Sequence, residues 1–64
     1  MATPLDALPK IGVPATSALT EAGYDSLRKL AGVPQVELAS LHGMGPKALR
    51  LIAQALEEHG LALG

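Results

Sequence analysis

Residues 41–48 read Leu-His-Gly-Met-Gly-Pro-Lys-Ala, and this stretch does most to decide the fold. Glycine tolerates a positive φ and leaves neighbouring amides uncovered by a Cβ, so Gly43 and Gly45 predict a tight turn. Proline suits the first position of a helix, where its missing N–H has no partner in any case. The stretch therefore predicts a tight turn, in which the glycines allow positive φ, followed by a helix.

That helix is predicted to be the longest of the chain, from Gly45-Pro46 to about His59, with Gly60 as its cap. Its apolar residues recur at intervals of three and four, which places them on one face. The expected core face is Ala48, Leu49, Ile52, Ala55 and Leu56. The acidic pair Glu57-Glu58 is interpreted as part of the exposed face.

Three shorter helices are predicted upstream, each bounded by glycine or proline. They are expected from Val13-Pro14 to Gly23, from an N-cap at Asp25 or Ser26 to Gly32, and from Val33-Pro34 onward. Their apolar positions are Ala15, Ala18, Leu19 and Ala22, then Leu27, Leu30 and Ala31, then Val36, Leu38 and Leu41. No alternating run of β-branched residues predicts a strand. The expected fold class is all-α, with four to five short helices.

The chain has 64 residues, 48% of them apolar, and a formal net charge of -1 from five basic and six acidic side chains. A chain of this length makes one small domain. We expect residues 8–64 to form it, after a flexible lead-in over residues 1–7. The charge balance argues against a strongly basic nucleic-acid binder. Any such binding must come from the local placement of cations and backbone amides.

No catalytic constellation stands out in the sequence. No nucleophile, base and orienting group occur at a recognisable spacing, and no cysteine joins His42 or His59 in a zinc site. We expect no enzymatic activity, no metal, no cofactor and no small-molecule substrate. The first residues lack the pattern of a signal peptide, and no apolar run reaches the ~18 residues of a membrane span. A cytoplasmic protein without membrane contact is expected, located at the nucleoid if it binds DNA.

The sequence repeats itself when residues 8–15 are laid over residues 41–48. Each copy has an apolar residue, a tight turn and the start of a helix. The matched pairs are Leu8 with Leu41, Ile11 with Met44, Gly12 with Gly45, Ala15 with Ala48, Leu19 with Ile52 and Ala22 with Ala55. Such a repeat predicts two related units that share one core around a pseudo-two-fold axis.

The second copy fits the helix-hairpin-helix pattern of apolar, Gly, apolar, Gly and then Ala three residues on. Hairpin amides and the N-terminus of the next helix would point toward one spot, where a phosphate oxygen can bind. Lys47 adds a charge there, Ala48 allows close helix packing, and Met44 anchors the hairpin to the core. The candidate DNA-binding residues of both copies are Lys10, Gly12, Gly43, Met44, Gly45, Lys47 and Arg50.

Residues 8–64 resemble the double helix-hairpin-helix domain at the C-terminus of the bacterial RNA polymerase alpha subunit, and similar small free-standing bacterial proteins. The likeness lies in Ala18-Leu19, Leu27-x-x-Leu30, Val36-Glu37-Leu38, Gly45-x-Lys47-x-Leu49 and the ending Gly60-Leu61-Ala62-Leu63-Gly64. The resemblance implies a tandem helix-hairpin-helix (SAM-like) fold that binds the minor-groove side of DNA, with Gly45 and Lys47 at contacting positions. Pro14 and Ser17 depart from the family, which has its principal DNA-contacting Arg and a supporting Asn there.

Two functions follow as alternatives. In the first, the hairpins bind phosphates of duplex DNA without sequence specificity, because backbone contacts position a protein but carry no sequence information. In the second, the scaffold is a protein-interaction module, for transcription-related docking or self-association, without direct DNA binding. The surface expected for that module is Thr16, Ser17, Thr20 and Tyr24.

Overall fold

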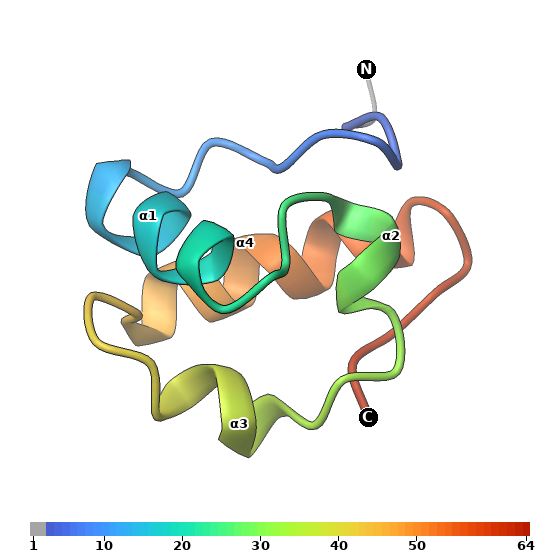
Figure 1. Ribbon diagram of the computed structural model, residues 1–64. Helices are drawn as coiled ribbons and strands as arrows, with labels where there is room; N and C mark the ends of the chain where they lie inside the picture. The colour runs from blue at the N-terminus through green and yellow to red at the C-terminus, as the bar shows by residue number, and fades with distance from the viewer. Residues whose placement is uncertain (1–2) are drawn as a thin grey trace.

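The computed structural model describes residues 3–64, which form four α-helices and no strand (Figure 1). The helices are α1 (Val13–Glu21), α2 (Leu27–Leu30), α3 (Gln35–Ala39) and α4 (Pro46–Glu57). The expected all-α fold class is confirmed, and each predicted helix is present. Met1 and Ala2, part of the predicted flexible lead-in over residues 1–7, lie outside the described residues.

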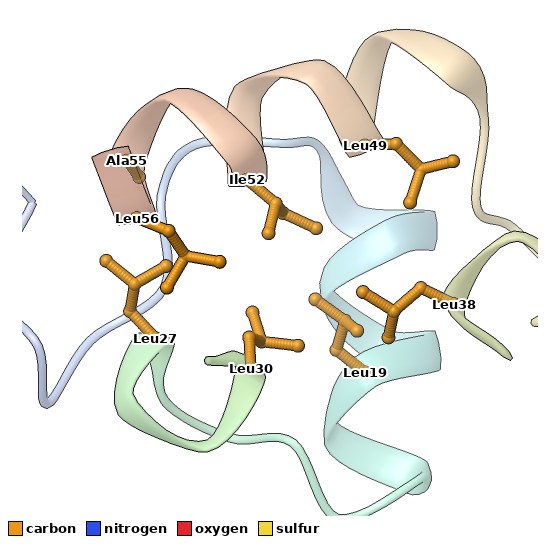
Figure 2. Packing of buried hydrophobic residues seen from close by; sticks show 8 residues of the cluster. All are labelled: Leu19, Leu27, Leu30, Leu38, Leu49, Ile52, Ala55 and Leu56. Carbon is orange, nitrogen blue, oxygen red and sulfur yellow. The ribbon is translucent and has the colours of Figure 1, made fainter. Parts of the chain in front are cut away.

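One aliphatic core holds the four helices together, and α4 supplies half of its buried cluster (Figure 2). The cluster consists of Leu49, Ile52, Ala55 and Leu56 from α4, facing Leu19 of α1, Leu27 and Leu30 of α2, and Leu38 of α3. All five residues of the predicted core face of α4 are buried. Met44 packs against this core, as predicted for the anchor of the second hairpin.

Two of the predicted core positions are wrong. Val36 is 74% exposed. Residues two apart in a helix point about 200° apart, so Val36 and Leu38 cannot share a face, and α3 buries Leu38. Ala22 is exposed because α1 ends at Glu21, which leaves Ala22 as the C-cap, beyond the face formed by Ala15, Ala18 and Leu19.

The N-terminus of α2 is capped by the backbone of a distant segment. Ser26 is the N-cap residue, but its side chain makes no capping hydrogen bond, and the side chain of Asp25 pairs with a lysine. The predicted side-chain cap is therefore wrong. The first two amides of α2 donate instead to the carbonyl groups of Ala7 and Leu5, at 2.8 and 2.9 Å. Tertiary structure thus satisfies amides that were expected to be capped locally.

The two terminal segments are tied down at the end of the molecule away from the loop before α4 (Figure 1). Nε2 of His59, just beyond α4, lies within hydrogen-bond distance of the Thr3 carbonyl oxygen. The C-terminal tail pairs with the loop between α2 and α3, since the Gly32 amide donates to the Ala62 carbonyl at 2.9 Å. These contacts leave the starts of α1 and α4 together at the opposite end.

Candidate nucleic-acid interface

The turn that precedes α4 lies beside the first turn of α1 (Figure 1). A Cβ at Gly43 would lie 2.8 Å from the carbonyl oxygen of Pro14, in the first turn of α1, and 3.4 Å from the Pro14 Cβ. Gly43 also has a φ of +92°, in the left-handed region that favours glycine. The two copies of the sequence repeat therefore touch through the first turn of α1 and the hairpin before α4.

Both of these helices begin at a glycine, which has no side chain to cap them. Gly12 is the N-cap of α1 and Gly45 that of α4, and neither helix start has a side-chain capping bond. The first helical hydrogen bond of α4 runs from the Leu49 amide to the Gly45 carbonyl, at 3.1 Å. The amides before it, at Lys47 and Ala48, have no partner within the helix. Lys47 is exposed, whereas Ala48 is buried.

The start of α1 offers a different set of donors. Its first helical bond runs from the Thr16 amide to the Gly12 carbonyl, at 3.0 Å. Of the three residues between them, Pro14 has no N–H, so the amides of Val13 and Ala15 are the free donors. Each helix start thus has two amides without a helical partner, one on an exposed residue, Val13 or Lys47, and one on a buried alanine.

The two N-cap glycines, which the repeat aligns, differ in conformation. Gly12 has φ 93° and ψ 156°, a combination that is essentially confined to glycine. Gly45 has φ -118° and ψ 171°, which any residue adopts. The positive φ that glycine allows is therefore used at Gly43 and not at Gly45. A Cβ at Gly45 would meet no atom within 4 Å, so neither backbone nor packing requires glycine there.

The five basic side chains divide into two groups. Arg28 pairs with Asp6 at 3.3 Å and Lys29 with Asp25 at 2.9 Å. Within residues 3–64, the other three have no carboxylate within ion-pair distance, and all are exposed: Lys10, Lys47 and Arg50. These three are the cations expected from the sequence to bind DNA. Lys47 and Arg50 are three residues apart, which makes them neighbours on the surface of α4.

The acidic residues of α4 lie far along the helix from Lys47, whereas Lys10 lines a hollow together with Glu57 and Glu58. Glu57 is ten residues beyond Lys47 (57 minus 47), which corresponds to about 15 Å along the helix. The helix start therefore carries positive charge and free amides, whereas its C-terminal end carries Glu57 and Glu58. This separation gives a chain of net charge -1 a locally cationic end.

Asp25, the partner of Lys29, has a pKa that is altered by this ion pair. Its pKa lies below the ordinary value of 3.8 because the Lys29 ammonium donates a hydrogen bond to the carboxylate and attracts its charge. We expect Lys29→Met to raise the Asp25 pKa toward that value, as followed by carboxyl NMR during an acid titration. Since the folded-state pKa is depressed, any stability from the pair is present above the unfolded-state pKa and lost as pH falls through the folded one. A pKa unchanged by Lys29→Met would contradict the pairing.

The surface predicted for a protein partner is partly used within the fold. Tyr24 packs against the core. The Thr20 hydroxyl donates to the Thr16 carbonyl inside α1, at 2.9 Å. Ser17 remains exposed, while Thr16 is half-buried.

One exposed residue of this region was assigned by the sequence only to the start of a helix. Val13 is 78% exposed and adjoins the contact between Pro14 and Gly43. The helical spacing contained the signal, because Val13 is two residues from the buried Ala15 and so points away from the core.

No protein-family model matches the chain, and no curated protein matches it at a significant level. Over residues 3–64, no three His, Asp or Glu side chains come together as metal ligands. No helix in that part of the chain is long and apolar enough to cross a membrane. Any functional assignment therefore depends on the residues and geometry of this chain.

Proposed function

We propose that the chain binds duplex DNA without sequence specificity, by holding backbone phosphates at the adjacent starts of α1 and α4. The contact between Gly43 and Pro14 carries this proposal, because it sets two uncapped helix starts beside each other. Free amides and the partial positive charge of such starts favour phosphate oxygens. A location at the nucleoid would follow from this activity.

The tandem helix-hairpin-helix (SAM-like) arrangement is part of the same proposal. The pairs matched by the repeat have similar environments in four cases: Leu19 and Ile52 are fully buried, Ala15 and Ala48 are buried, and both Ile11 with Met44 and Leu8 with Leu41 are partly buried and pack against the core. This agreement supports two related units around one core. The pair Ala22 and Ala55 departs from it, since only Ala55 is buried.

The distribution of charge supports the same site. Lys10 lies in the first copy of the repeat, while Lys47 and Arg50 follow the turn of the second, and none of the three has an ion-pair partner among the described residues. A cation without an internal partner keeps its charge available for phosphate. The paired cations, Arg28 and Lys29, lie on α2 instead.

The test is a titration of a labelled DNA duplex at several salt concentrations. For two to four neutralised phosphates, log affinity should fall against log salt with a slope of about -2 to -3.5. Lys47→Gln should weaken binding about fivefold near 0.1 M salt and make the slope shallower by about 0.9. Lys29→Gln is the matched control, because it removes a cation that is already paired with Asp25.

Three results would count against DNA binding through this site. One is a salt slope near zero for the unchanged chain. Another is an equal loss of DNA affinity in Lys47→Gln and Lys29→Gln, which would indicate that the net charge of the chain, and not a cation at this site, determines binding. The third is a rise in molecular mass with concentration, without DNA and without response to duplex, which would favour the protein-interaction alternative.

A further inference from the structure

Beside the start of α1 lies an apolar hollow whose apolar side chains take no part in the proposed phosphate contacts. It is lined by residues 8–13 together with Thr16 and Ser17. Leu8 and Ile11 pack against the core and form its inner wall, whereas Val13 stands at its edge with 78% of its surface exposed. Val13 and Val36 are the two large apolar residues left exposed among the described residues.

The charges around the hollow indicate what kind of molecule it suits. None of its lining residues is acidic, and it includes Lys10, which has no ion-pair partner within residues 3–64. The hollow adjoins the start of α1, because Gly12, the N-cap of that helix, and Val13 are among its lining residues. An occupant should therefore present an apolar surface next to a negative charge.

We propose that this hollow takes a deoxyribose of the bound DNA strand, with Val13 against the carbon edge of the sugar and Lys10 at the adjoining phosphate. The assignment rests on the proposed function and adds an apolar contact to it. A deoxyribose offers an apolar carbon edge, and the phosphates on either side of it carry negative charge, so together they match the apolar lining and Lys10. Each deoxyribose has the same carbon edge whatever base it carries, so the contact adds affinity without sequence preference.

The experiment compares three substitutions in the duplex titration. Val13→Ser should weaken binding about three- to fivefold, because it removes apolar surface that DNA would bury. It should leave the salt slope unchanged, since no charge is altered, whereas Lys10→Gln should make the slope shallower by about 0.9. Val13→Leu keeps the apolar contact and should bind as the unchanged chain does.

Val36→Ser is the matched control, because Val36 is exposed to the same degree but lies on α3. It should leave DNA affinity unchanged. In a sample with labelled valine methyl groups, duplex should shift the Val13 signals and leave those of Val36 in place. Both valines are exposed, so neither serine variant should alter the melting temperature by more than a few degrees.

The outcomes separate this inference from the function on which it rests. If Val13→Ser binds as tightly as the unchanged chain while Lys47→Gln binds more weakly, the deoxyribose contact is overturned and DNA binding stands. If the unchanged chain shows no salt-dependent binding, both are overturned. If Val13→Ser abolishes a concentration-dependent dimer and leaves DNA affinity unaltered, the occupant is a second copy of the chain and the deoxyribose contact is wrong.

Discussion

Gly45→Ser is expected to leave the fold at least as stable while weakening DNA binding about tenfold. Gly45 is the N-cap of α4, with φ -118° and ψ 171° and with no atom within 4 Å of an added Cβ. Serine adopts this conformation readily, and its hydroxyl accepts hydrogen bonds from the second and third amides of a helix. Replacing an N-cap glycine by serine should therefore stabilise the helix by a few tenths of a kcal/mol.

The same hydroxyl would compete with the DNA. The amides that it would cap belong to Lys47 and Ala48, the donors proposed for the phosphate. Loss of roughly 1.4 kcal/mol from these charge-assisted hydrogen bonds corresponds to a tenfold weaker affinity. Thermal denaturation and the duplex titration measure the two effects on one variant. A variant with both higher stability and unchanged affinity would show that these amides do not bind phosphate.

Gly45→Ala serves as the companion to this variant. Alanine adds the Cβ without the hydroxyl, and it is a poor N-cap, so it should lower stability slightly. If the serine variant binds DNA less tightly than the alanine variant, occupation of the amides is the cause. Equal losses would instead point to the Cβ obstructing the approach of the phosphate.

The helices could be predicted from the sequence because glycine and proline mark their ends. Pro14 and Pro46 stand in first turns, and Gly23 and Gly60 follow the ends of α1 and α4 with positive φ. The spacing of apolar residues along α4 gave its buried face correctly because twelve residues contain several turns of a helix. In the five-residue α3 the same reasoning failed at Val36, since so short a helix buries a single residue.

The geometry of the candidate site depended on tertiary contacts that no local pattern contains. The repeat aligns Gly12 with Gly45, and yet their φ angles are 93° and -118°. The sequence likewise gave no sign that Gly43 would lie against Pro14, twenty-nine positions earlier (43 minus 14), or that carbonyl groups of the N-terminal segment would cap α2. What the sequence did contain was the residues of the site: glycines before two helices, with lysines nearby.

The contact between Gly43 and the first turn of α1 leads to the largest expected loss of stability. Gly43→Ala should cost about 2–4 kcal/mol in the free energy of unfolding. Roughly 1–2 kcal/mol comes from placing a side chain at φ +92°, and the remainder from the clash with the Pro14 carbonyl oxygen, 2.8 Å from the added Cβ. In a domain of this size, each kcal/mol lowers the melting temperature by about 4–8 °C. A fall of about 8–32 °C is therefore expected.

Gly23→Ala separates the two causes, because Gly23 has the same φ of +92° but no atom within 4 Å of an added Cβ. It should show only the conformational cost, about 1–2 kcal/mol. The difference between the two losses in free energy of unfolding then measures the cost of the clash between the added Cβ and the Pro14 carbonyl group. If both variants lose the same stability, the turn before α4 can move away from the first turn of α1. The adjacent helix starts on which the proposed DNA binding depends would then not be a fixed feature of the chain.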